Sequence, residues 1–307
     1  MGRYIARRLL LTIPVMLGAS FLIFAMVYAL PGDPIRALGG DRPLAPAVVA
    51  QLREDFNLND PFLVQYVKYL GDLVQGDFGT DFRGRDVLET ITQRLPVTAR
   101  LALVAVLFEI VIGIVAGVLA GIRRNSFLDN VVLVSTTIVV SVPILVLAFV
   151  AQYTLGLRLN LFPIAGIREG WYSYLLPGLV LAAGSVAYVA RLTRTSMAEN
   201  LRADYVRTAR AKGLPTRDVI VRHTLRNSLI PVVTFIGADI GTLMGGAIVT
   251  ETVFNIPGIG RTVFDSIQAQ EGAVVVGIVT LLVFFFIFFN LVVDVLYAVL
   301  DPRIRYE

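Results

Sequence analysis

The residues of this 307-residue chain that could do covalent chemistry are too few to build a catalytic or metal site. Cysteine is absent and His223 is the only histidine, which excludes a thiol nucleophile, a disulfide framework and a multi-histidine metal centre. A phosphate-binding G-x-x-x-x-G-K-[ST] loop is missing, so the chain should not bind ATP by that route. No Ser/His/Asp or Cys/His set is available for nucleophilic catalysis. We therefore expect no catalytic, cofactor-binding or metal-binding residue, and a function based on conformational change.

Three acidic residues within apolar segments remain as candidates for a functional role. Glu109, Asp239 and Asp294 each interrupt a run of apolar residues, and an ionisable side chain at membrane depth is a functional candidate by default. The sequence shows no titratable partner for any of the three, which favours a structural carboxyl group at Glu109. For Asp239 the functional and the structural interpretation both stay open.

A break within one apolar segment adds two residues to these candidates. Ser141-Val142-Pro143 interrupts the segment, and a proline removes a backbone hydrogen bond and kinks a helix. Irregular helices occur in membranes where they are buried in protein or line a cavity. This suits a translocation path, although many purely structural helices also contain a proline. The candidate path residues are Ser141, Pro143, Asp239 and Glu109.

Six apolar segments must position these residues. Apolar residues make up 56 % of the chain and its mean hydropathy is +0.74, and about 20 such residues suffice for one helix to cross a bilayer. A signal peptide fits the first segment poorly, because the segment is long and ends without an A-x-A site. The sequence predicts an all-α polytopic membrane protein with six transmembrane helices, at Leu9–Leu30, Leu101–Ile122, Asn130–Leu155, Tyr174–Ala190, Leu229–Val249 and Ala273–Leu300.

A basic loop separates the fourth and fifth segments. Residues 191–231 contain three acidic residues and nine Lys or Arg residues, a density typical of a cytoplasmic loop. A short helix is predicted from Asp204, a suitable N-cap, to Lys212, and Gly213 would end it. A second helix is predicted from Thr216, as its cap, to Pro231. Composition alone favours a solvated loop whose charges only set the orientation of the chain in the membrane. The small side chains on the first helix would instead let the surface of a partner approach closely.

Two polar regions are expected on the other side of the membrane. Residues 31–100 contain helical patterns at Pro46–Phe56 and Phe62–Val74, and Asp86 is a suitable cap for a helix at Val87–Leu95. Aromatic residues that need burial favour a small external subdomain over a mere linker. Residues 251–271 either face a partner or form a re-entrant turn that only packs. Glycines 237, 241, 245 and 246 would let the fifth helix pack closely, within this chain or against a second subunit.

The distribution of basic residues predicts the topology. Sixteen Lys and Arg residues fall at the termini, at residues 123–124 and in the basic loop, against three in the two short external loops. This positive-inside bias places both termini in the cytoplasm. The predicted organisation is a first helix with the N-terminus (1–30), an external subdomain (31–100), a core of the other five transmembrane helices (101–300) that includes loop 191–231, and a cytoplasmic tail (301–307).

The basic loop also resembles a known element. DYVRTARAKGL followed by RHTLRNSLIPV is similar to the EAA-type loop of the membrane subunits of ATP-binding-cassette (ABC) importers, and in particular to the B subunit of dipeptide and oligopeptide permeases. Thr208-Ala209-Arg210 stands in place of Glu-Ala-Ala, a departure common in the peptide branch. The resemblance extends over nearly the whole chain, including GDFGTDFRGRDV, ETVF…PGIG and the N-terminal RYIARRLLLTIPVMLGASFLIF.

The resemblance implies a type I importer (MetI-like) fold in the bacterial inner membrane. It also implies a permease for short peptides, with a paralogous six-helix permease, two ATP-binding subunits and an extracytoplasmic substrate-binding protein as partners, and no nucleic acid. ATP and Mg²⁺ would be bound by those partners. The resemblance assigns ATPase docking to a coupling helix formed by Asp204, Tyr205, Val206, Thr208, Ala209, Arg210, Ala211, Lys212, Gly213 and Leu214.

Other substrates and other classes of membrane protein have to be distinguished from a peptide importer. Nickel, glutathione and haem importers share the same branch, so the substrate stays open. A stand-alone secondary transporter or channel would be expected to show paired intramembrane charges, internal repeats or a filter-like loop, which the sequence lacks. A membrane scaffold without transport would leave a partner ATPase insensitive to the substrate-loaded binding protein.

Overall fold

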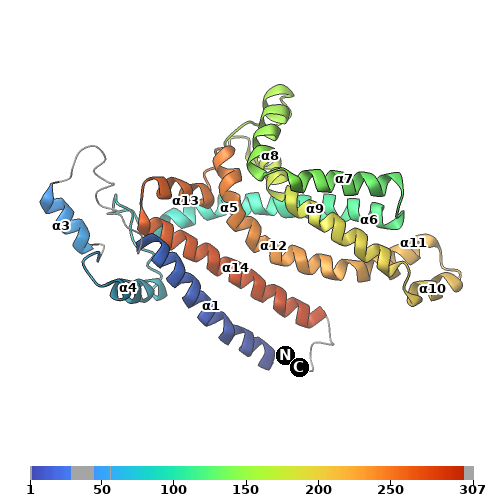
Figure 1. Cartoon of the computed structure of the whole chain (residues 1–307), viewed down its shortest axis with the longest axis horizontal. Coiled ribbons are helices and arrows are strands. Elements are labelled where there is room, and N and C mark those ends of the chain that lie inside the picture. Colours follow the sequence, from blue (N-terminus) through green and yellow to red (C-terminus); the bar gives the residue numbers. More distant parts are fainter. Residues whose placement is uncertain (1, 29–44, 56, 301–307) are drawn as a thin grey trace.

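The computed structural model describes residues 2–28, 45–55 and 57–300, and within these residues the chain is helical without a β-strand (Figure 1). Residues 1, 29–44 and 56 and the predicted tail 301–307 lie outside the described residues. Five uninterrupted helical stretches are long and apolar enough to cross a membrane. They are Arg7–Tyr28 within α1 (Gly2–Tyr28), Val87–Ile122, Gly170–Asn200, Thr216–Val253 and Gly272–Val293 within α14 (Gly272–Leu300).

The predicted third helix is a bent pair. Helix α7 (Phe127–Ser141) is followed by α8 (Ile144–Ala151) and a π-helical turn, η2 (Gln152–Arg158), and the helix axis bends by 105° between the two arms. Pro143 has no N–H to continue the hydrogen bonds of α7, so the helix ends before it. The chain therefore has six spans only if this bent pair counts as one. The predicted break at residues 141–143 is confirmed.

Several predicted helices are longer in the structure. Helix α5 (Val87–Phe108) continues through a π-helical turn, η1 (Glu109–Gly113), into α6 (Ile114–Ile122), so the external helix predicted to end at Leu95 is one with the second span. The fourth span, α9 (Leu175–Asn200), runs ten residues into the predicted basic loop. Helix α12 (Arg226–Val253) continues η4 (Val219–Leu225) and passes Pro231, where the second loop helix was predicted to end.

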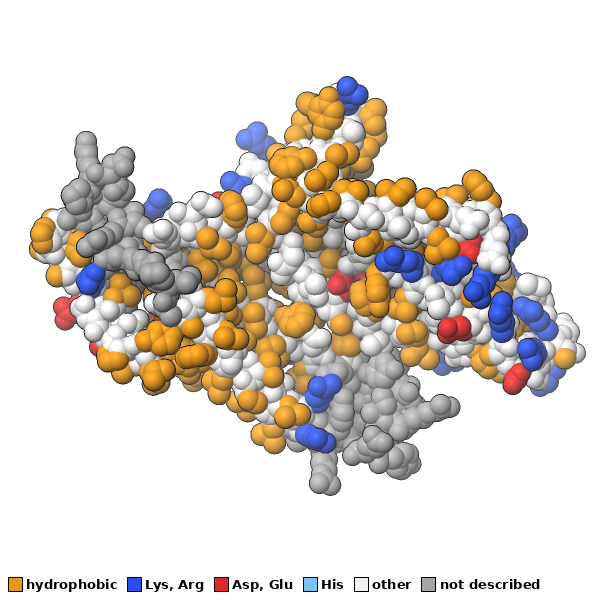
Figure 2. All heavy atoms as spheres, viewed as in Figure 1, with side chains coloured by type: hydrophobic (Ala, Val, Ile, Leu, Met, Phe, Trp, Pro, Cys, Tyr) orange, Lys and Arg blue, Asp and Glu red, His pale blue; other side chains and the backbone are white. Residues whose placement is uncertain are grey.

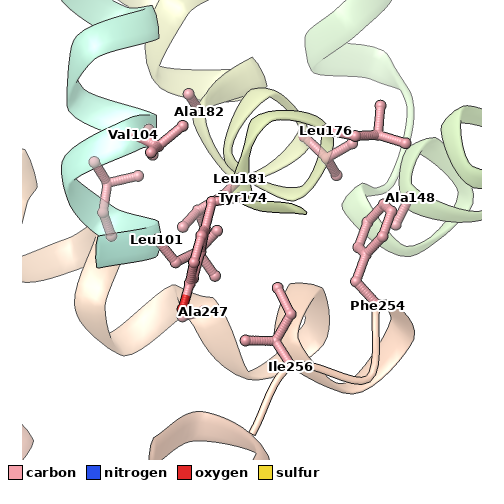
Figure 3. Packing of buried hydrophobic residues seen from close by; sticks show 13 residues of the cluster. Leu101, Val104, Ala148, Tyr174, Leu176, Leu181, Ala182, Ala247, Phe254 and Ile256 are labelled. Atoms are coloured by element: carbon pink, nitrogen blue, oxygen red, sulfur yellow. The ribbon is translucent and has the colours of Figure 1, made fainter. Parts of the chain in front are cut away.

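Helix α9 is the centre of the helical bundle. It packs against α5, η1, α6, α7, α8 and α12. Its start contributes to a core that also receives side chains from α5, α8, α12 and the segment after α12. Figure 3 shows Leu101, Tyr174, Ala148 and Phe254 of this core converging from different helices. The core therefore fixes α8 and the end of α12 to the same side of α9.

A stripe of glycines allows α9 to approach its neighbour closely. Gly113, Gly117 and Gly121 recur every four residues along η1 and α6 and face Val189, Thr193 and Met197 of α9. A Cβ added at any of the three would lie within 3.0 Å of a side-chain atom of α9. Small residues at this spacing let two helix backbones meet in a membrane. The stripe was not among the sequence predictions.

The glycines that were predicted to make a packing face divide into two pairs. Gly237 and Gly241 pack against Val293 and Phe286 of α14 in the same chain, whereas Gly245 and Gly246 have open space around them. Helix α14 also packs antiparallel to α1, so the beginning of α1 and the end of α14 lie side by side at the lower edge of the view (Figure 1). The turn between α6 and α7 lies at the same end of the molecule as α10 (Asp204–Ala211) in Figure 1.

The opposite end holds α3 (Pro46–Asp55), α4 (Phe62–Val74) and α13 (Ile259–Gln268) (Figure 1). The positions predicted for α3 and α4 are confirmed. Tyr66 and Tyr69 of α4 pack with Phe24 of α1, and the Tyr69 hydroxyl donates a hydrogen bond to Thr280 of α14 at 2.9 Å. The Asp86 cap is also confirmed, since its carboxylate accepts a hydrogen bond from the Leu88 N–H at 2.7 Å.

One carboxylate organises the turn that precedes α5. Asp81 Oδ1 accepts hydrogen bonds from the backbone N–H groups of Arg83 and Arg85, both at 2.8 Å, and Oδ2 accepts one from the Arg85 guanidinium at 2.7 Å. Burial by itself would raise the pKa of Asp81, but these hydrogen bonds outweigh it and lower the pKa below its usual value.

This lowered pKa predicts an acid-sensitive turn. The stabilisation is complete above the unfolded pKa of about 4 and is lost as the pH falls through the lower folded value. Protection of the amides of residues 81–87 from hydrogen exchange should therefore fall only in that acid range. The Asp81→Asn variant should show the lower protection at neutral pH already. Equal protection in the two proteins at neutral pH would contradict this role for Asp81.

Candidate coupling surface and membrane cavity

Helix α10 ends in a turn that depends on glycine. Gly213 has a φ of +74°, in the left-handed region. Its N–H donates to the Arg210 carbonyl at 2.9 Å, and the Leu214 N–H donates to the Ala209 carbonyl at 3.3 Å. These two hydrogen bonds form a Schellman motif, in which glycine takes the left-handed position without a Cβ penalty. The predicted end of this helix at Gly213 is confirmed.

The predicted N-caps of the two loop helices are wrong. Ala203 holds the cap position of α10, and Asp204 is the first helical residue, with its carboxylate 3.4 Å from Arg207. Pro215 holds the cap position of α11 (Thr216–Asp218), so Thr216 is also one position too late. Asp204 at the first turn still adds negative charge where the helix dipole favours it.

The two faces of α10 have different surroundings. Val206 and Ala209 are buried against Val219 of η4. This small cluster holds α10 against the start of the long helix that contains α12. The opposite face is exposed, and basic side chains gather at this end of the molecule (Figure 2). The exposed candidate docking residues are Asp204, Tyr205, Thr208, Arg210, Ala211, Lys212, Gly213 and Leu214.

A cavity of about 360 Å³ lies between α7, α8, α9 and α12. Its walls are mainly apolar, from side chains such as Val139, Leu147 and Leu243. Asp239 of α12 lines it and accepts a hydrogen bond from the Ser185 hydroxyl of α9 at 2.5 Å. The cavity has the size and the largely apolar lining of a small-ligand pocket.

Two of the other candidate path residues, Ser141 and Pro143, are sequence neighbours of residues that line this cavity. Ser141 and Pro143 form the α7–α8 break, and the cavity is lined by their neighbours Val142 and Ile144. The Ser141 hydroxyl donates to the Thr137 carbonyl at 2.8 Å, within α7. Glu109 does not line the cavity. The side chain of Asp294 lies outside the described residues.

Glu109 is fully buried in the π-helical turn η1. Neither of its carboxyl oxygens has a hydrogen-bond partner among the described residues. The Glu109 and Asp239 carboxyl groups are near enough to interact electrostatically, so the expectation that Glu109 has no titratable partner is wrong. The sequence could not reveal this pairing, since the two residues are 130 positions apart and come together only through the packing around α9.

A buried ion pair joins α7 and α9. Asp129 of α7, 1 % exposed, accepts two hydrogen bonds from the Arg194 guanidinium of α9, at 2.5 and 2.8 Å. The backbone N–H of Asn125 donates to the same carboxylate at 2.8 Å. The pair thus ties α7 to the extension of α9. Sequence reasoning assigned Arg194 only to the topology and missed Asp129.

The segment after α12 is held by a second buried carboxylate, Glu251. One oxygen accepts a hydrogen bond from the Thr98 hydroxyl of α5 at 2.5 Å, and the other accepts one from the Arg261 N–H at 2.9 Å. Gly258 precedes α13 and has no side chain to cap it, so the Glu251 carboxylate takes that place at the helix N-terminus. Phe254 and Ile256 are buried as well. Residues 251–259 therefore form a packed turn, and both predicted alternatives for the 251–271 segment, contact with a partner and packing alone, stay open.

Removing the Thr98 hydroxyl should loosen this turn. Besides donating to Glu251, the hydroxyl accepts a hydrogen bond from the Ile259 N–H at 2.8 Å, so Thr98→Val leaves a buried donor and a buried acceptor without their partner. We expect a loss of about 1–2 kcal/mol, measured as a lower apparent Tm of the purified chain. Thr92→Val, the same change at an exposed position of α5, is the control and should change the Tm little. Equal effects of the two substitutions would contradict the bridging role.

Two family models match the chain on either side of η1. Residues 1–102 match the N-terminal part of a binding-protein-dependent transport system membrane component, and residues 113–306 match the binding-protein-dependent transport system inner membrane component. The chain belongs to this family of inner-membrane transport components. It is an all-α, multi-pass membrane protein with the MetI-like fold, and a permease subunit of an ABC importer, as its sequence predicts.

Curated relatives match the chain along its whole length. A dipeptide transport system permease protein, DppB, of Alkalihalophilus pseudofirmus is 37 % identical over 99 % of both chains. A probable peptide ABC transporter permease of Sinorhizobium fredii is 38 % identical, and a glutathione transport system permease, GsiC, of Salmonella choleraesuis is 40 % identical, each over 100 % of both chains. The substrates in these names differ although the similarity is nearly equal.

Proposed function

We propose that this permease subunit takes up short peptides that an extracytoplasmic binding protein delivers to it. The observation that carries the proposal is full-length similarity to permeases named for dipeptides and peptides. Glutathione is the second candidate substrate, because permeases named for it are equally similar. Glutathione is itself a small peptide, so a cavity of about 360 Å³ suits both substrates.

The proposed mechanism is conformational and contains no chemical step in this chain. ATP and Mg²⁺ bind to two separate ATPase subunits, and a paralogous permease completes the membrane pathway. ATP-driven closure of the ATPases moves α10, and the motion reaches the spans through the continuous helix from Thr216 to Val253. A partner can shift the equilibrium between two conformations of the permease only by binding them with different affinity. The exposed face of α10 offers the surface for this contact.

The proposed orientation places both termini and α10 in the cytoplasm. Its support is the positive-inside pattern together with the position of the α6–α7 turn beside α10 (Figure 1). Helices α3, α4 and α13 then face the binding protein. No nucleic acid has a part in this mechanism.

The test is uptake by the assembled importer in proteoliposomes, with its binding protein outside and ATP inside. The proposal predicts accumulation of a labelled dipeptide that stops when ATP is omitted or when the binding protein is left out. Accumulation of glutathione but not of dipeptides would select the second substrate. Uptake by this chain alone without ATP would instead indicate a secondary transporter.

A further inference from the structure

The membrane cavity carries two opposite charges on otherwise neutral walls. Among the described residues that line it, Asp239 and Arg191 are the only charged ones. Ser185, Tyr188 and Thr242 supply the polar uncharged groups, and the remaining walls are aliphatic or glycine. A charge in such surroundings favours a partner of the opposite sign, because apolar walls solvate it poorly.

Asp239 is suited to bind a cation. Its side chain is largely buried, and Ser185 donates to Oδ2 while Oδ1 has no hydrogen-bond partner among the described residues. No basic residue pairs with this carboxylate in the described part of the chain. The two carboxyl oxygens of Glu109 are buried and unpaired among the described residues, and Glu109 interacts electrostatically with Asp239, so both acids would favour a positive ligand.

Arg191 is suited to bind an anion. It has no ion-pair or hydrogen-bond partner among the described residues, although Arg194, one turn further along α9, is fully engaged with Asp129. Arg191 follows Ser185 by six residues, which corresponds to about 9 Å along the helix axis. The cationic and the anionic positions are therefore separated along one wall of the cavity.

We propose that the cavity binds a short zwitterionic peptide by both ends, its ammonium group at Asp239 and its terminal carboxylate at Arg191. An extended peptide spans about 3.3–3.6 Å per residue, so two or three residues match the separation of the two charges. The aliphatic walls would accept different peptide side chains with little discrimination, whereas the charges of Asp239 and Arg191 select the two terminal groups. This inference rests on the proposed peptide substrate and adds the residues that hold it within the membrane.

The test uses thiol protection in the assembled importer without its binding protein, so that only the membrane cavity selects the ligand. The chain has no cysteine, so Thr242→Cys places its single thiol in the cavity, three residues from Asp239 on α12. The probes are Ala-Ala, acetyl-Ala-Ala, which lacks the ammonium group, and Ala-Ala-amide, which lacks the carboxylate. We expect Ala-Ala to slow modification by a neutral methanethiosulfonate reagent, and each blocked peptide to protect about tenfold less well.

A second substitution, made in the Thr242→Cys variant, shows which residue holds each end of the peptide. Adding Asp239→Asn should abolish the difference between Ala-Ala and acetyl-Ala-Ala, and adding Arg191→Gln should abolish the difference between Ala-Ala and its amide. Thr195→Cys, an exposed position of α9 that does not line the cavity, is the matched control and should show no protection. Equal protection by the three peptides in the Thr242→Cys background would overturn the inference, even if Asp239→Asn or Arg191→Gln failed to assemble. Such a result beside normal ATP-dependent peptide uptake would leave the proposed function standing, whereas absent uptake would refute that function.

Discussion

Replacing Gly213 by valine is expected to lower ATP-driven uptake by about 5- to 30-fold while the chain still inserts and assembles. A β-branched residue at a φ of +74° costs about 1–2 kcal/mol, which is a factor of 5–30 in a conformational equilibrium. The Schellman turn would open, and the exposed face of α10 would lose its orientation relative to α11. The space around Gly213 is open, so no clash should prevent folding.

The control for this prediction is Gly213→Asn. The chain already places asparagine in the left-handed region at residues 57, 125, 160 and 255, and asparagine tolerates that region better than other side chains do. Gly213→Asn should therefore keep most of the uptake. The measurement compares uptake and ATP hydrolysis in the same proteoliposomes, where Gly213→Val should weaken the stimulation of hydrolysis by the loaded binding protein. Unchanged uptake by Gly213→Val would reject the docking role of this turn.

Adding one methyl group at Gly117 is expected to give the largest loss of stability. Its Cβ would lie 2.5 Å from Thr193 Cβ and 2.6 Å from the Ala190 carbonyl oxygen, so α6 and α9 would have to separate. Overpacking costs about 1–3 kcal/mol and at times more. Because a backbone atom is among these contacts, we expect the upper end, about 3 kcal/mol, and the gain of about 1 kcal/mol in helix propensity offsets part of it. We expect a net loss of about 2 kcal/mol and a lower apparent Tm of the purified chain.

Gly18→Ala is the matched control because Gly18 lies within α1 with open space around it. The same change should be neutral or slightly stabilising there, since only the helix propensity changes. A stability of Gly117→Ala equal to that of Gly18→Ala would show that the α6–α9 contact is not as close as described here.

Much of the fold could be predicted from local patterns. Apolar runs and basic clusters predicted the membrane class, Pro143 predicted the break at residues 141–143, and helical spacing predicted α3 and α4; each of these signals is a property of neighbouring residues. The Schellman turn at Gly213 and the Asp86 cap were predictable for the same reason, because each depends on a few adjacent residues. The resemblance of the basic loop to a known element added the class of transporter, which the family match confirms.

The parts that could not be predicted depend on contacts between distant residues. Asp239 meets Ser185, and Glu251 meets Thr98 across 153 positions. Caps at Asp204 and Thr216 were placed one residue late because Ala203 and Pro215 hold the cap positions without a side-chain hydrogen bond. The glycine stripe at residues 113–121 lies inside an apolar run, so only its spacing of four could have indicated it. The contribution of the candidate docking and path residues to transport stays a prediction.

The most direct test of the account is a photo-cross-link from α10 in native membranes. Because the chain has no cysteine, Arg210→Cys can carry a benzophenone maleimide at a single site in this chain. The account predicts a covalent adduct with an ATP-binding subunit, and none from Gln75→Cys, an exposed position after α4. An ATPase adduct from Gln75→Cys, or its absence from Arg210→Cys in a complex that retains the ATPase, would contradict the docking role and the proposed orientation.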